Sequence, residues 1–179
     1  MDGKFHAPDT LPADAQQAKG TDSSNAPADH FTRKLSREEM VQICARVMRN
    51  RREGRFAEIA AVFTHDAEMF CPGIPGHIPV AGRFKGRDEC IAAMRANFTL
   101  IEAVDLVPQE FFVDDTSVGI SWSGAVRNRG TGPMVRIEGF ARLHFRGDKI
   151  CFYSNHVDTA AIAALAQSPP IKITSPRRP

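Results

Sequence analysis

The chain has 179 residues, of which 42% are hydrophobic and 25% are charged, and its formal net charge is +2. This composition is that of a globular domain and excludes a protein that is disordered or membrane-like overall. The small net charge gives no reason to expect a nucleic-acid partner. No apolar run approaches the roughly 20 residues of a membrane-spanning helix, and no segment near the start is typical of a signal peptide. We therefore expect a cytoplasmic protein without membrane contact.

The two ends of the chain differ in composition from its middle. Residues 1–34 are rich in Ala, Asp, Pro and Ser and show no periodicity, which predicts a disordered arm because little apolar surface is available to offset the ordering entropy. Residues 168–179 form a proline-rich tail that cannot be helical. One domain is expected over residues 35–167.

Two amphipathic helices are predicted at the start of this domain. Ser36 and Glu39 form a capping-box pattern, and Gly54 is a typical helix end. Apolar residues recur between them at helical spacing, at Met40, Ile43, Cys44 and Val47. The second helix shows the same spacing at Phe56, Ile59, Ala60 and Phe63.

A basic cluster lies at the end of the first helix. Its members are Arg46, Arg49, Arg51, Arg52 and Arg55. Cations there complement the negative end of the helix dipole, so we interpret the cluster as a solvated face, with phosphate or nucleic-acid binding as the alternative.

The rest of the domain alternates between strands and helices. A short strand is predicted over residues 67–71, then an extended Pro/Gly-rich loop over 74–84. A third helix opens at Gly86, with an inner face made of Ile91, Met94, Arg95 and Phe98. Four strands follow over residues 104–113, 117–127, 134–145 and 149–157.

Two further signals complete the pattern. Pro108 interrupts the first of these four strands and predicts an edge or a bulge, and Asp158 with Thr159 begins a final helix. Helices segregated to one face of an antiparallel sheet indicate an α+β fold.

The order and spacing of these elements resemble the SnoaL-like and ketosteroid-isomerase-like branch of the nuclear-transport-factor-2-like superfamily, over residues 36–167. The resemblance is carried by Gly54 with residues 56–63, by residues 65–69, by Gly82 and Gly86, and by residues 145–160. It implies a cone-shaped, strongly curved antiparallel sheet with three helices on its concave side, a cystatin-like α+β barrel. It also implies an apolar cavity between the layers and a homodimer formed through the convex sheet face.

The catalytic groups of the ketosteroid isomerases are missing at the matching positions. Cys71 stands where that family places its basic aspartate, Val47 where it places a tyrosine, and Ala141 where it places a protonated acid. A positioned base and an oxyanion donor each contribute on the order of 10²-fold or more to the rate. We therefore exclude steroid isomerisation by the family mechanism. Gly139 and Ala141 likewise disfavour epoxide hydrolysis as some relatives perform it.

The remaining polar groups give three catalytic candidates. Strand alternation predicts that Tyr153 and Asn155 face the cavity together with Ala141, so they could hold a ligand carbonyl or enolate; the alternative is a core tyrosine. Asp158 is a candidate acid or base, or simply a helix cap. His77 lies in the loop predicted to cover the entrance and is a candidate general base, or an exposed loop histidine.

Other residues are candidates for ligand contact. Cys71 would be a nucleophile only if a cation, for which Arg95 is the candidate, lowered the pKa of its thiol; the alternative is an inert buried thiol. Trp122, Met94 and Phe98 are predicted to line the apolar wall. On the opposite face of the sheet, we expect His144 and Arg142 to contribute to the dimer interface.

No metal site or cofactor is expected, because none of the four cysteines forms a C-x-x-C pair. The main functional hypothesis is an enzyme, such as a polyketide cyclase, that acts on a small apolar carbonyl compound by cyclisation, dehydration or isomerisation. The alternatives are a non-catalytic ligand-binding or dimerising module and an accessory subunit of an oxygenase-type complex.

Overall fold

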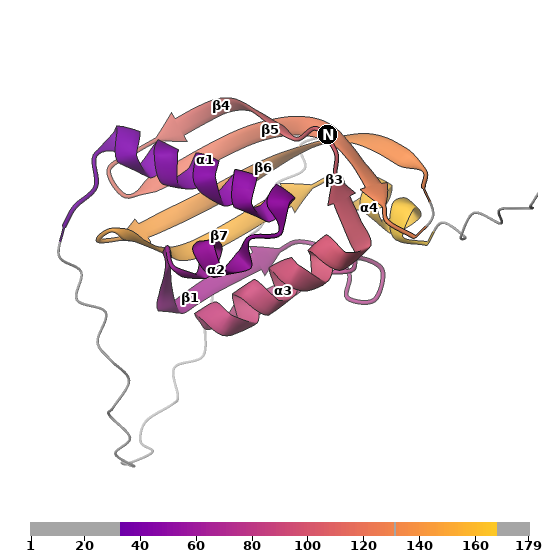
Figure 1. Ribbon diagram of the computed structural model, residues 1–179, viewed down its shortest axis with the longest axis horizontal. Helices are drawn as coiled ribbons and strands as arrows, with labels where there is room; N and C mark the ends of the chain where they lie inside the picture. The colour runs from indigo at the N-terminus through magenta and orange to yellow at the C-terminus, as the bar shows by residue number, and fades with distance from the viewer. Residues whose placement is uncertain (1–32, 131, 168–179) are drawn as a thin grey trace, which may run out of the picture.

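The computed structural model describes residues 33–130 and 132–167, so the predicted tail and nearly all of the predicted arm lie outside the described residues. The described part is α+β, with helices packed on a seven-stranded sheet (Figure 1). The elements are, in chain order, α1 (Arg37–Glu53), α2 (Phe56–Ala60), β1 (Phe63–Cys71), β2 (Gly82–Lys85), α3 (Arg87–Leu100), β3 (Ile101–Ala103), β4 (Val107–Val113), β5 (Ser117–Asn128), β6 (Met134–Arg146), β7 (Lys149–Val157) and α4 (Thr159–Ala166). None of the described helices has the length and apolar character needed to cross a membrane.

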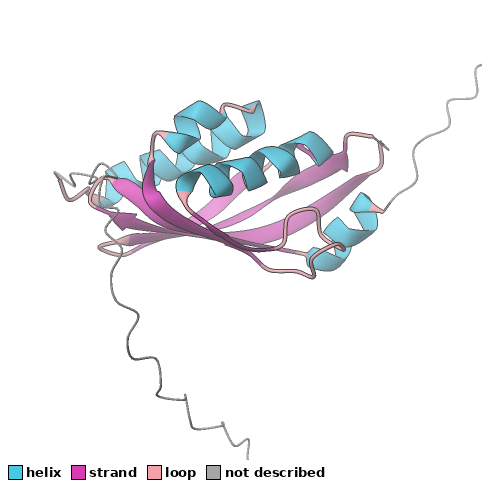
Figure 2. Ribbon diagram, turned by 90° about the horizontal axis from the view of Figure 1, so that it is seen from below, coloured by secondary structure: helices cyan, strands magenta, loops and turns pink. Residues whose placement is uncertain are grey.

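The sheet is mixed rather than wholly antiparallel. Its order is β2-β1-β7-β6-β5-β3, with β4 also paired to β5. β1 runs parallel to β7, whereas the other strand pairs are antiparallel. The sheet is strongly curved, and α1, α2 and α3 lie on its concave side, as expected (Figure 2). The long strands β5, β6 and β7 form the central part of that concave face.

The first helix has the predicted start and the predicted buried face. The Ser36 hydroxyl accepts a hydrogen bond from the Glu39 amide at 3.2 Å, and the Glu39 carboxylate accepts one from the Ser36 amide at 2.8 Å, which completes the capping box. The four apolar residues at helical spacing, Met40, Ile43, Cys44 and Val47, are all buried against the sheet. Burial of such side chains contributes about 1.5–3 kcal/mol each.

Two boundaries differ from the sequence prediction. The second helix ends at Ala60, and Phe63 begins β1, where its side chain is fully buried and its backbone pairs with Ile150 of β7. The predicted strand over 67–71 is therefore longer at its start, because an aromatic and β-branched pair at 63–64 favours the pleated sheet. The segment 82–85, most of which was predicted to belong to the loop over 74–84, is the edge strand β2 and pairs with β1.

The proline in the fourth strand acts as predicted. The register of β4 on β5 shifts between Pro108 and Glu110, which makes β4 a bulged strand. Of the predicted strand over 104–113, only residues 107–113 form a strand, β4; residues 104–106 separate it from the short strand β3, which ends at Ala103 and was not predicted.

Gly54 determines where α1 stops and therefore where its last arginines lie. Its backbone is left-handed, with a φ of 72°, and a Cβ added there would lie 2.9 Å from Cζ of Phe98. The Phe98 ring cannot easily move away, because it packs edge-on against Phe56 at 5.5 Å and lies 4.5 Å under the Arg129 guanidinium.

We expect Gly54→Ala to lower the free energy of unfolding, by about 1–2 kcal/mol for the left-handed backbone alone and by more because of the contact with Phe98. Gly76→Ala is the matched control, since Gly76 has a φ of 85° and no atom within 4 Å of the added Cβ. Urea unfolding of both variants measures the difference. Equal losses would mean that Phe98 does not restrict this position.

Candidate functional site

A cavity of about 330 Å³ lies between the concave face of the sheet and the helices α1 and α3. Its wall is mainly apolar, and Ile162 of α4 closes part of it. The volume is within the roughly 300–1,000 Å³ of typical small-molecule sites. Both strands and helices contribute apolar and thiol side chains to the cavity lining. These include Cys44, Val47, Met48, Met69, Cys71, Met94, Phe98, Ile120, Trp122, Ile137, Ala141, Leu143 and Val157.

The predicted alternation of β6 and β7 is confirmed. Ala141 and Leu143 of β6 line the cavity, as do Tyr153, Asn155 and Val157 of β7. Pairing places Ala141 beside Asn155 and Leu143 beside Tyr153, so the inward residues of the two strands form adjacent rows. The expected wall residues Trp122, Met94 and Phe98 line the same space.

Trp122 can line the cavity wall in this position only because the residue that pairs with it on β6 is a glycine. Gly139 pairs with Trp122, and a Cβ at Gly139 would lie 2.2 Å from Cζ2 of the indole and 2.7 Å from the carbonyl oxygen of His156. The indole therefore lies across the backbone of β6 and not over the centre of the cavity. A side chain at position 139 would push Trp122 into the space that a ligand needs.

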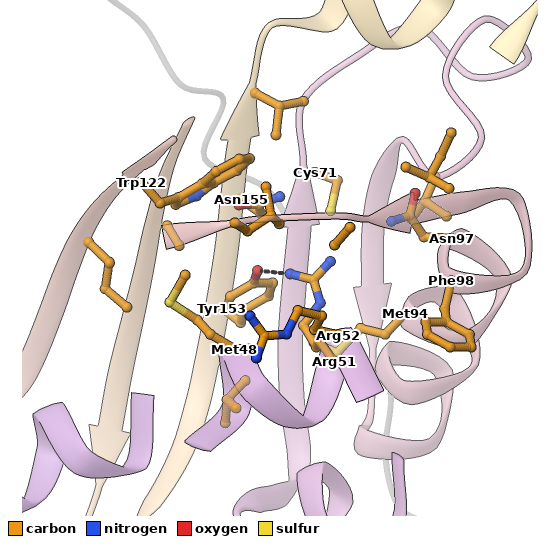
Figure 3. Close-up of a pocket in the computed structure, with 18 of the residues that line it drawn as sticks. Met48, Arg51, Arg52, Cys71, Met94, Asn97, Phe98, Trp122, Tyr153 and Asn155 are labelled. Atoms are coloured by element: carbon orange, nitrogen blue, oxygen red, sulfur yellow. Dashed lines mark hydrogen bonds between the residues drawn. The ribbon is translucent and has the colours of Figure 1, made fainter. Parts of the chain in front are cut away.

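The polar centre of the cavity is a contact between Arg51 and Tyr153. Arg51 reaches from α1 to β7, where its Nη1 donates a hydrogen bond to the Tyr153 hydroxyl (Figure 3). The guanidinium carbon is 5.6 Å from the centre of the tyrosine ring. Tyr153 is only 4% exposed, whereas Arg51 is half-buried.

This contact leaves Tyr153 as a hydrogen-bond donor. Burial raises the pKa of its phenol above the ordinary value, and the positive charge of Arg51 opposes that effect only in part. The hydroxyl is therefore protonated at neutral pH. Its oxygen accepts from Arg51, and its proton has no acceptor in the part of the chain that the structure describes. A ligand oxygen in the cavity would satisfy this donor.

Arg51 was assigned to the solvated basic cluster by the sequence analysis, and this was wrong. The signal that could have placed it is the helical spacing itself, because Arg51 follows Cys44 by seven residues and Val47 by four, on the buried face of α1. Arg49 and Arg52 also line the cavity but are exposed, while Arg46 is exposed and does not line it. Asn97 of α3 is a second polar residue of the lining that was not predicted.

Cys71 lines the cavity, but its thiol is not activated. Burial raises the pKa of Cys71, and Arg51 lowers it by a smaller amount, so the neutral thiol is favoured. The cation that acts on Cys71 is therefore Arg51. The sequence analysis named Arg95 for this role, and that prediction is wrong. Arg95 is exposed on the outer side of α3, where its guanidinium lies 4.8 Å over the Phe56 ring.

Two of the three predicted catalytic residues lie outside the lining. Asp158 is exposed, and its carboxylate accepts a hydrogen bond from the Ala161 amide at 3.0 Å, which caps α4. His77 is exposed in the loop between β1 and β2, although Ile78 and Val80 of that loop line the cavity. The structure therefore does not bring Asp158 or His77 to Tyr153.

The polar inventory of the site limits its chemistry. Apart from the thiols, its polar side chains are Arg49, Arg51, Arg52, Asn97, Tyr153 and Asn155. Among the described residues, no carboxylate or imidazole lines the cavity, and no group of His, Cys, Asp and Glu is arranged to hold a metal ion. The site can donate hydrogen bonds to an oxygen, but its described lining supplies no general base.

We expect the pKa of Tyr153 to lie above its ordinary value of 10.0 and to rise further in Arg51→Met, because that variant loses the cation that stabilises the phenolate. Tyr153 is the only tyrosine of the chain, so the ultraviolet absorbance of tyrosinate reports it alone. In the unfolded chain the phenol ionises at a lower pH than in the folded chain. The contribution of Tyr153 to the free energy of unfolding is therefore present below pH 10 and is lost as the pH rises through the folded-state pKa. An unchanged or lower pKa in Arg51→Met would contradict the contact.

The fold has many relatives among solved structures. An NTF2-like protein from Burkholderia xenovorans is 23% identical, with a TM-score of 0.65 over 74% of this chain and 98% of that one. A Catenulispora acidiphila protein with a ketosteroid isomerase-like fold, in complex with trimethylamine, is 14% identical, with a TM-score of 0.60 over 72% and 94%. TerC, co-crystallised with polyporic acid, is 18% identical, with a TM-score of 0.62 over 73% and 99%.

At these identities the solved structures establish the fold alone. No curated protein matches the sequence significantly. The SnoaL-like domain, however, matches residues 45–153, which is more than half of the chain and includes most of the cavity lining. The chain therefore belongs to the SnoaL-like domain family.

Proposed function

We propose that this protein binds a small, mainly apolar molecule and holds one of its carbonyl or hydroxyl oxygens at Tyr153. The observation that carries the proposal is the phenolic proton, which is buried in an apolar cavity and has no acceptor among the described residues. A buried donor of this kind costs free energy unless a ligand or a water accepts its hydrogen bond. Two structural neighbours were crystallised with small molecules, trimethylamine and polyporic acid, which supports a ligand role for this type of cavity.

Isomerisation or cyclisation of a carbonyl compound is the second candidate. Tyr153 and Arg51 are adjacent donors that could stabilise an enolate, the charge that develops when a proton is removed beside a carbonyl. The described lining has no base to remove that proton, so the substrate or solvent would have to supply one. Recovery of a bound ligand unchanged after long incubation would favour binding, and conversion would favour catalysis.

The test of the binding proposal compares 2-acetylnaphthalene with 2-ethylnaphthalene, which lacks the carbonyl oxygen. We expect calorimetry to give about fivefold tighter binding of the ketone, the value of one net hydrogen bond. Tyr153→Phe should remove this preference. Trp122→Ala should weaken the binding of both compounds, because it removes part of the apolar cavity wall.

Ser154→Ala is the matched control, since it also removes a buried hydroxyl from β7 but on the opposite side of the sheet from Tyr153. This variant should leave the ketone preference intact. A preference that survives in Tyr153→Phe would show that the oxygen binds elsewhere.

We also propose a homodimer formed through the convex face of the sheet. Phe112 of β4 and Phe140 of β6 are 54% and 39% exposed there, with ring centroids 6.2 Å apart. Their rings approach over Gly119 of β5, which pairs with Phe112 and has no side chain to separate them. Arg142 and His144 follow on β6, and burial lowers the pKa of His144, so a neutral imidazole is available for an interface.

Sedimentation should give a dimer at micromolar concentration, and Phe140→Glu should convert it to a monomer because it places a charge in the apolar centre. Ala96→Glu is the control, as it adds the same charge to an exposed position of α3. A monomeric unmodified protein would contradict the proposal.

A further inference from the structure

Three arginines line the cavity, and all belong to the last turns of α1. They are Arg49, Arg51 and Arg52. The described lining contains no Asp or Glu to balance them. Arg49 and Arg52 are exposed, so solvent screens their charge. Arg51 is half-buried, and its charge acts more strongly within the apolar space.

Arg51 also differs from other arginines of the domain in its partner. Several have a carboxylate: Arg37 pairs with Asp115 at 3.3 Å and Arg127 with Glu102 at 2.7 Å. Arg51 forms no ion pair within the described ranges, and its hydrogen-bond partner is the neutral phenol of Tyr153. A partly desolvated cation without a counter-ion is costly, and the cost is relieved when an anion binds beside it.

The helix dipole explains only part of this arrangement. A cation in the last turn of a helix is stabilised by the carbonyl groups at that end. Such a cation is stabilised in solvent as well, as for Arg52, which lies in the same last turn and is exposed. Arg51 instead extends across the cavity to β7, and this direction follows from the buried face of α1 (Figure 3).

We infer that the ligand of this cavity is a carboxylic acid with an apolar body, bound with its carboxylate at Arg51 and Tyr153. This inference rests on the proposed ligand-binding function and specifies the charge of the ligand. Arg51 uses one N–H group on Tyr153, which leaves the other donors of its guanidinium for a carboxylate, the partner whose geometry it matches best. The Tyr153 proton supplies a further hydrogen bond to the same group. Asn155 lies two residues after Tyr153 on the same face of β7, and its amide lines the same cavity.

The experiment uses 2-naphthoate and 2-acetylnaphthalene, which have nearly the same shape but differ in charge at neutral pH. Calorimetry on the full chain should show that the acid binds on the order of tenfold more tightly than the ketone, as expected for a charge-assisted hydrogen-bonded pair. Arg51→Met should abolish this preference, because the acid should lose more affinity than the ketone when the cation is removed. Arg51→Lys, which keeps the charge but not the planar donors, should retain part of it.

Arg46→Met is the matched control, because it removes the same charge from the same helix outside the cavity. It should leave both affinities unchanged, and thermal unfolding of each variant checks that the fold is intact. Equal binding of acid and ketone by the unmodified protein would overturn the inference while leaving the proposed function in place. An acid preference that survives in Arg51→Met, or is lost equally in Arg46→Met, would also overturn it. If neither compound binds, the proposed function itself is contradicted.

Discussion

The structure depends on a concave sheet face that is left unfilled at its centre. Long strands alternate their side chains, so every second residue of β5, β6 and β7 must point toward the helices. Most such positions carry large apolar side chains and form the core. Gly139 and Ala141 are the exceptions on β6: the Trp122 indole packs against Gly139, and Ala141 lines the cavity. Small residues at inward positions of β6 therefore leave room for the cavity and for the Trp122 indole in its wall.

The end of α1 adds the charge that this apolar space otherwise lacks. Gly54 terminates the helix in a left-handed conformation, two residues after the neighbouring arginines Arg51 and Arg52. Because the helix packs with Cys44 and Val47 against the sheet, Arg51 follows on the same side one turn later and cannot avoid the cavity. A guanidinium there polarises the Tyr153 hydroxyl and leaves its proton to be donated, so the two residues act as one donor unit.

Much of this arrangement could be predicted from the sequence, and the failures have physical reasons. Strand parity correctly placed Tyr153 and Asn155 in the cavity, because a period of two leaves no ambiguity once one face is buried. The spacing of residues in a helix predicts less firmly which side chains face the core. Arg95 was expected on the inner face beside Met94, yet the 100° between neighbouring residues carries it to the exposed side.

The loops and the charged residues were the harder cases. The residue type of Arg51 and its place at a helix end predict a solvated side chain, whereas its helical spacing from Cys44 and Val47 predicts the buried face. His77 and Asp158 were selected as titratable groups, but a residue in a loop or at a helix cap is placed by tertiary contacts that the sequence pattern does not encode. The edge strand β2 has four residues, too few to display an alternation.

The same geometry explains how this SnoaL-like domain departs from the ketosteroid isomerases. Val47, Cys71 and Ala141, the positions that the resemblance matches to catalytic groups of those enzymes, all line the cavity, and none of them carries a carboxylate or a hydroxyl. The polar donors of the cavity lie beside these positions: Arg51 is one helical turn beyond Val47, and Asn155 pairs with Ala141 across β6 and β7. Tyr153 is two residues before Asn155 on the same face. The polar centre of this cavity therefore consists of a cation and neutral donors. Such a centre stabilises negative charge on a ligand oxygen without a group that would generate it, and this favours recognition of an acid that is already ionised.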